Sequence, residues 1–70
     1  MKRYYIQDEF SEREELSELD FHQSILYNAS VSVEYGDYED FEECMEYVNQ
    51  ELNCYGSVEL NAFTYSIEEE

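Results

Sequence analysis

The sequence predicts an α+β domain with a three-stranded sheet packed on one long helix, in the order β-α-β-α-β with the first helix short. Apolar residues recur every three or four positions from Asp37 to Leu52, as in an amphipathic helix. Apolar and polar residues alternate from Ile25 to Tyr35, as in a strand. The 70 residues suffice for one domain, 1–70, with a thin core.

Two elements are expected before residue 20. A first strand should run from Lys2 to Phe10, where apolar and polar residues alternate. A short helix should follow at residues 11–19, because Ser11 and Glu14 have the spacing of a capping box. The chain would then enter the alternating segment, in which Leu26 is the one exception to the pattern.

The long helix from Asp37 to Leu52 is the clearest element, with Asp37 as its predicted N-cap and Gly56 just beyond its end. Its apolar side would bury residues such as Cys44 and Val48. The opposite side carries carboxylates without an interspersed lysine, namely Glu39, Glu42, Glu43 and Glu46. Like charges three or four residues apart each cost about 0.2–0.5 kcal/mol, so these acids indicate a purpose beyond solubility.

The last strand is expected from Ser57 to Ile67. Its apolar pattern changes phase near Asn61 and Ala62, which predicts a bulge there or a strand that is apolar on both faces. A right-handed crossover favours parallel outer strands, with the first strand between them and antiparallel to both.

One helix covers only one face of such a sheet, so the other face should carry an apolar, tyrosine-rich patch. A patch of that kind is typical of an interface, and it predicts a homodimer. The residues expected in the dimer interface are Phe63, Tyr65, Ile67, Leu26 and Tyr5.

The charge limits the classes of partner. The chain has 19 Asp and Glu against 3 Lys and Arg, a formal net charge of -16. Small domains stay soluble with a net charge of about 2–8, and a larger excess weakens the compact state by self-repulsion. Direct binding to nucleic acid or to an anionic membrane is excluded by repulsion, and a basic protein is the expected partner.

Other chemistries have little support. There is no EF-hand loop for calcium, and His22 with the two separated cysteines is not a zinc set, so no metal or cofactor is expected. A core this thin leaves little room for a pocket that would tune a catalytic carboxylate, so no enzyme is expected. Cys44 and Cys54 are predicted to be reduced and no signal peptide is recognisable, which favours the cytoplasm.

The acidic surface can instead imitate the phosphates of DNA, which carry one charge per ~1.7 Å of duplex. Glu39, Glu42, Glu43 and Glu46 are the expected phosphate surrogates, and a second group should extend the surface, namely Glu12, Glu15 and Glu18.

In length, charge, aromatic content and lack of enzyme motifs, the chain resembles the small acidic DNA-mimic proteins of bacteriophages. These include antirestriction proteins, anti-CRISPR proteins, inhibitors of uracil-DNA glycosylase and inhibitors of the histone-like nucleoid protein HU. The resemblance implies a host-takeover or counter-defence role in the cytoplasm of an infected bacterium. HU is the preferred target, since a mimic made mostly of charge suits a protein that reads the DNA backbone.

Other hypotheses remain open. The alternative target is a restriction nuclease or a CRISPR effector complex. An acidic antitoxin or adaptor would bind a basic protein that does not handle DNA, and would depend more on Phe63 or Tyr65 than on the helix carboxylates. A domain from a high-salt environment would be acidic for reasons unrelated to a partner.

Overall fold

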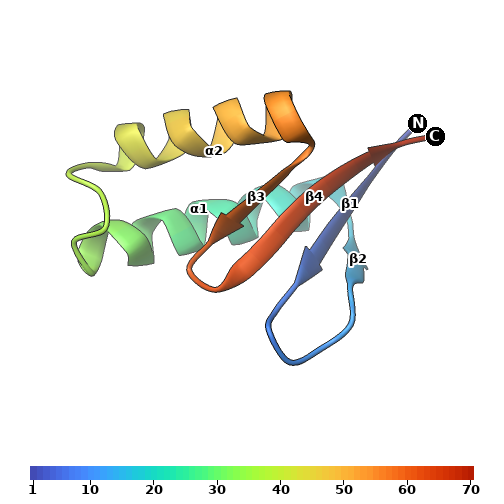
Figure 1. Cartoon of the computed structure of the whole chain (residues 1–70), viewed down its shortest axis with the longest axis horizontal. Coiled ribbons are helices and arrows are strands. Elements are labelled where there is room, and N and C mark those ends of the chain that lie inside the picture. The colour runs from blue at the N-terminus through green and yellow to red at the C-terminus, as the bar shows by residue number, and fades with distance from the viewer.

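The computed structural model describes residues 1–70 as two layers, with two helices covering one face of a four-stranded antiparallel sheet (Figure 1). The sheet order is β2-β1-β4-β3. The predicted three-stranded sheet on one long helix is therefore wrong, as is the expectation of parallel outer strands. The elements in chain order are β1 (Lys2–Gln7), β2 (Glu14–Leu16), α1 (Glu18–Glu34), α2 (Phe41–Tyr55), β3 (Ser57–Leu60) and β4 (Phe63–Glu69).

Helix α1 overturns the largest part of the predicted fold, because it contains residues 25–34 of the segment 25–35 that was predicted to be a strand, and Tyr35 is its C-cap. Ser17 caps the helix by accepting a hydrogen bond from the Asp20 N–H at 3.1 Å. Its buried residues follow helical spacing, but two of them are polar, and this hides the helical period: they are Phe21, Ile25, Asn28, Ala29 and Ser32. Val31 and Val33 add strand-like alternation, and packing overrides that local preference.

The segment 11–19 forms no helix of its own. Ser11 instead donates its hydroxyl hydrogen to Asp8 at 2.7 Å, and the Phe10 N–H donates to the same carboxylate oxygen at 2.9 Å. These hydrogen bonds lower the pKa of Asp8, with that from Ser11 contributing most. The loop they close returns the chain to pair with β1, and places Leu16 opposite Tyr4.

Helix α2 is confirmed as an element, with its start moved along the chain. Asp40 is the N-cap, not Asp37, whose N–H donates to the Ser32 carbonyl at 3.0 Å and so belongs to the end of α1. Gly56 ends α2 as predicted, in the left-handed conformation at φ 73°, and its N–H donates to the Leu52 carbonyl at 3.0 Å.

The predicted strand 57–67 is a β-hairpin, and the expected bulge is its turn. Asn61 and Ala62 both have positive φ, at 50° and 68°, as a two-residue type I′ turn requires. The turn places Val58 opposite Tyr65, so the two apolar sets that seemed out of phase share the helix-facing side of the sheet.

The core lies between the layers. The ring of Phe21 packs against those of Tyr4 and Tyr65, with centroids 5.0 and 5.7 Å apart. The Tyr65 hydroxyl accepts a hydrogen bond from Asn28 Nδ2 at 2.5 Å, and it lies 2.8 Å from Ser24 Oγ. The buried apolar cluster consists of Phe21, Ile25, Ala29, Cys44, Val48, Val58, Leu60 and Tyr65.

Candidate protein-binding surface

The predicted phosphate surrogates lie on the first half of α2 and immediately before it. Glu42 and Glu46 are exposed on α2, and Glu39 is exposed in the preceding loop. Glu42, Glu43 and Glu46 span about 6 Å of helix axis, or about 3 Å per carboxylate. One strand of duplex DNA carries a phosphate about every 3.4 Å, so the axial density of charge is similar.

Glu43 has a structural role in addition to its charge. Its N–H donates to Asp40 Oδ1 at 2.8 Å, while its own Oε2 accepts from the Glu39 N–H at 3.1 Å. These two hydrogen bonds resemble a capping box, except that the Glu43 side chain accepts from the N–H of the residue before the N-cap, and they fix the start of α2. A substitution of Glu43 therefore changes both the helix start and the surface charge.

The cationic groups of the chain gather on the sheet, away from these acids. Arg3 Nε lies 3.0 Å from Glu70 Oε1, and Arg3 Nη1 lies 3.7 Å from Glu15 Oε1. Arg13 pairs with Glu68. No ion pair in the structure involves a residue between Gln23 and Ile67, so the carboxylates of α2 remain uncompensated.

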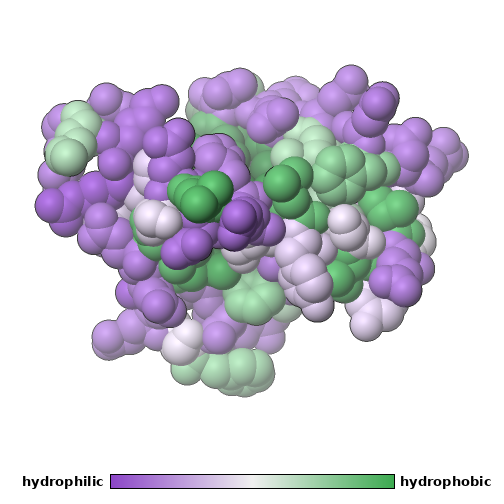
Figure 2. All heavy atoms as spheres, turned by 180° about the vertical axis from the view of Figure 1, so that it is seen from behind, coloured by the Kyte–Doolittle hydropathy of each residue, from purple (hydrophilic) through white to green (hydrophobic).

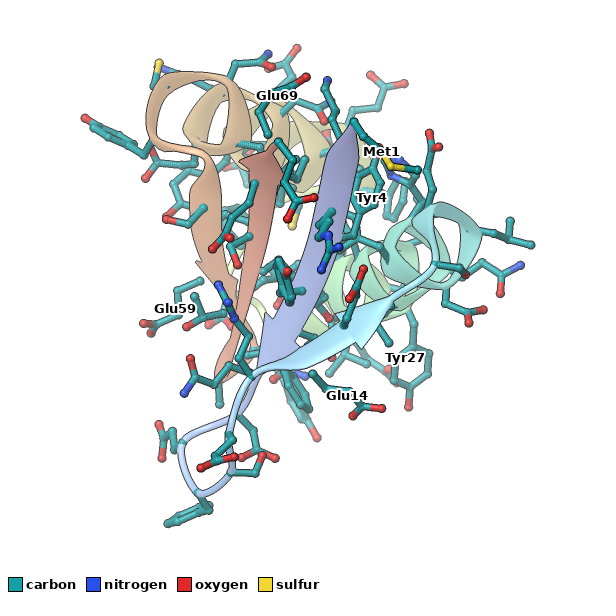
Figure 3. All side chains as sticks on the ribbon, turned by 90° about the vertical axis from the view of Figure 1, so that its right-hand side faces the viewer. Met1, Tyr4, Glu14, Tyr27, Glu59 and Glu69 are labelled. Atoms are coloured by element: carbon teal, nitrogen blue, oxygen red, sulfur yellow. The ribbon has the colours of Figure 1, made fainter.

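The N-terminal ammonium is another cationic group that lies on the sheet. Its ammonium lies 3.9 Å from Glu69 Oε1 and donates a hydrogen bond to the Glu70 carbonyl at 2.9 Å. Figure 3 shows Met1 and Glu69 at the same end of the sheet, with Glu14 and Glu59 on its two edge strands. Part of the negative charge is thus neutralised on the sheet, and none of it on α2.

The outer face of the sheet is polar. Tyr5 is its one large apolar side chain and is only 8% exposed, because the Arg13 guanidinium carbon lies 3.9 Å from the centre of its ring. Its cross-strand neighbours are Glu15 and Ser66. The predicted apolar patch on this face is therefore absent.

The other residues predicted for the dimer interface lie elsewhere. Tyr65 is fully buried in the core, and Phe63 and Ile67 pack against the core from the same side of the sheet. They point inward because two helices, and not one, cover that side. Leu26 is exposed, but on α1.

The second predicted acidic group does not join the first. Glu15 is on β2 and Glu18 opens α1, whereas Figure 1 shows the start of α2 at the opposite end of the molecule. Glu12 lies in the loop before β2. Glu15 is paired with Arg3, and Glu18 Oε1 lies 4.0 Å from His22 Nε2. The structure thus has two separate acidic groups and not one ridge.

No group of three or more His, Cys, Asp or Glu side chains is placed to hold a metal ion, and no pocket opens on the surface. Cys44 and Cys54 are free thiols, and burial raises the pKa of Cys44. Neither helix has the length and apolar character needed to cross a membrane.

Comparisons with protein-family models, with curated proteins and with solved structures found no match to this chain.

Proposed function

We propose that the protein is a non-catalytic DNA mimic, which binds the DNA-contacting surface of a basic bacterial protein in the cytoplasm and blocks its access to DNA. The supporting observation is the separation of charge. Glu39, Glu42 and Glu46 lie at the start of α2 without a cation, whereas Arg3 and Arg13 are engaged in ion pairs on the sheet.

The free energy of binding would come from several ion pairs that form together. One exposed ion pair contributes only about 0.2–1 kcal/mol, because water and salt screen it. A surface that binds DNA, however, carries many Lys and Arg residues spaced to meet successive phosphates. Carboxylates at similar spacing can engage several of these cations at once, and the self-repulsion of the free mimic is relieved on binding.

Nucleoid protein HU is the first target to test, because a patch of carboxylates without base-like groups suits a protein that reads the DNA backbone. A restriction nuclease or a CRISPR effector is the alternative target. The hypothesis of an antitoxin or adaptor that binds through Phe63 or Tyr65 loses its basis, since these side chains pack in and against the core. Their replacement by Asp would test the fold and not a binding surface.

The direct experiment is calorimetric titration of purified HU with the protein and with a variant carrying Glu39→Gln, Glu42→Gln and Glu46→Gln. Glutamine keeps the side-chain shape and the helix propensity while removing the charge. Glu43 and Asp40 are left intact, because they cap α2. We expect the triple variant to bind about tenfold more weakly at low salt, which is about 1.4 kcal/mol.

A matched control removes the same number of charges elsewhere, with Glu9→Gln, Glu14→Gln and Glu59→Gln, all at exposed positions off the helices. This control should retain most of the affinity. Equal weakening by both variants would mean that only net charge matters, and would contradict a contact surface on α2. Absence of HU binding by the wild type would exclude HU, and the same pair of variants then applies to a nuclease or effector target.

A further inference from the structure

The outward side of α1 differs from the rest of the surface, because its centre carries no formal charge. From Phe21 to Val33 the helix contains no Asp, Glu, Lys or Arg. Two large apolar side chains on this side are well exposed, Leu19 at 66% and Tyr27 at 70%. We call the following set the α1 outer face: Leu19, Gln23, Leu26, Tyr27 and Ser30.

These residues share one side of the helix, since their spacing follows three to four residues per turn. The Ser30 hydroxyl donates to the Leu26 carbonyl at 3.1 Å, so its hydrogen is already used within the helix. Figure 2 views the molecule from the helix side, where green and near-white side chains gather from the centre to the right with purple ones around them. Figure 3 shows Tyr27 on the side of α1 away from β3 and β4.

The lack of charge indicates what covers this face. A basic partner would gain from carboxylates on its docking surface, and the 13 residues from Phe21 to Val33 are the longest stretch of the chain without Asp or Glu. A second copy of the chain, at -16, can approach only where carboxylates do not oppose one another. We propose that the α1 outer face is the contact between two copies of this chain. This proposal does not depend on the proposed function.

A two-fold axis near Leu26 would make the contact isologous and run the two α1 helices antiparallel. The uncharged centre would be buried, and the acids at the helix ends, Asp20 and Glu34, would lie at the rim. The helix has 17 residues and is about 25 Å long. One side of a helix of this length buries less area than a standard complex, in which each partner buries about 800 Å². The dimer should therefore be reversible.

Salt gives this interface a distinctive signature. Like charges at the rim repel, and added salt screens that repulsion, so the dimer should strengthen as NaCl increases. Binding to a cationic partner has the opposite salt dependence, because screening weakens attraction. The sign of the salt effect therefore separates the two kinds of contact.

Sedimentation equilibrium over a range of protein and NaCl concentrations tests the proposal. The average mass of the wild type should rise from 8.5 kDa toward twice that value with concentration, and should rise further with salt. The double variant Leu26→Gln, Tyr27→Gln should remain at the monomer mass. Both side chains point outward, at 44% and 70% exposed, so circular dichroism should show an unchanged fold.

The control Phe10→Gln changes another exposed aromatic residue, in the loop after β1, and should dimerise like the wild type. A wild type that stays monomeric at every concentration and salt level would overturn the proposal. So would a dimer that survives the double variant, or one that dissociates as salt is added.

Discussion

Tyr65 places a hydroxyl group inside an apolar core, and the residues around that hydroxyl determine its hydrogen bonds and its pKa. Its oxygen accepts from Asn28 Nδ2 and lies within hydrogen-bond distance of Ser24 Oγ, which ties β4 to α1. Burial raises the pKa of Tyr65, and its hydrogen bonds with Ser24 and Asn28 offset part of that rise. Burial is also the main cause of the raised pKa of Tyr38 and of Tyr47.

The raised pKa of Tyr65 leads to a prediction of how the free energy of unfolding changes at alkaline pH. Because the folded pKa of Tyr65 lies above the unfolded value of about 10, the unfolded chain loses its proton first as the pH rises. The associated stability is fully present below about pH 10 and is lost as the pH rises through the folded pKa. Urea unfolding at a series of pH values from neutral to alkaline should show this fall.

The variant Tyr65→Phe separates the hydroxyl from the ring. At neutral pH it should lose about 1–2 kcal/mol, because Asn28 and Ser24 lose a hydrogen-bond partner. Above pH 10 its stability should fall less steeply than that of the wild type. An identical slope in both proteins would show that Tyr65 does not control the alkaline transition.

At the scale of elements, α2 and α1 show what a sequence pattern can and cannot predict. The buried side of α2 contains Cys44 and Val48, with no polar residue to interrupt the period, and Gly56 marks its end. The buried side of α1 includes Asn28 and Ser32, whose burial depends on partners distant in sequence. Asn28, for example, accepts from Asn61 Nδ2 at 2.8 Å, a contact that no local pattern contains.

The candidate site likewise has a part that could be predicted from the sequence and a part that could not. The outward direction of Glu42 and Glu46 follows from the helical period alone, so the sequence was enough to predict it. The location of the cations was not predictable, because Arg13 meets Glu68 only once β1, β2 and β4 are assembled. The α1 outer face was missed because the helix that carries it was predicted to be a strand.

The start of α2 gives a prediction at this scale. Asp40→Ala should lower the free energy of unfolding by about 1 kcal/mol, because the Glu43 N–H loses its acceptor. Asp37→Ala is the matched control, since only the backbone of Asp37 takes part in the end of α1. Urea unfolding of both variants decides between the two caps, and a larger loss for Asp37→Ala would contradict the structure at this point.

At the scale of the whole molecule, repulsion between carboxylates opposes the stability that a small core provides. The chain carries a net charge of -16 in a body with extents of 35 × 25 × 20 Å. The Debye length is about 30 Å at 0.01 M salt and about 10 Å at 0.1 M, so nearly all the acids repel one another at low salt and only neighbours do so at moderate salt. Self-repulsion should therefore limit the stability of the free protein.

Thermal unfolding at low protein concentration should show this directly. Tm should rise as NaCl is added, by about 4–8 °C for each kcal/mol of repulsion that is screened in a domain of this size. The Glu39, Glu42 and Glu46 to Gln variant should start from a higher Tm at low salt and gain less. A wild-type Tm that is flat or falls with salt would show that the carboxylates are compensated in the folded state.

We propose that the uncompensated carboxylates at the start of α2 take the place of DNA on a cationic protein. The most direct measurement is the release of fluorescently labelled duplex DNA from HU, a restriction nuclease and a CRISPR effector as the protein is added. We predict that at least one of them releases its DNA, that NaCl suppresses the competition, and that the Glu39, Glu42 and Glu46 to Gln variant competes far more weakly. Retention of DNA by all three proteins, or equal release by wild type and variant, would contradict the claim.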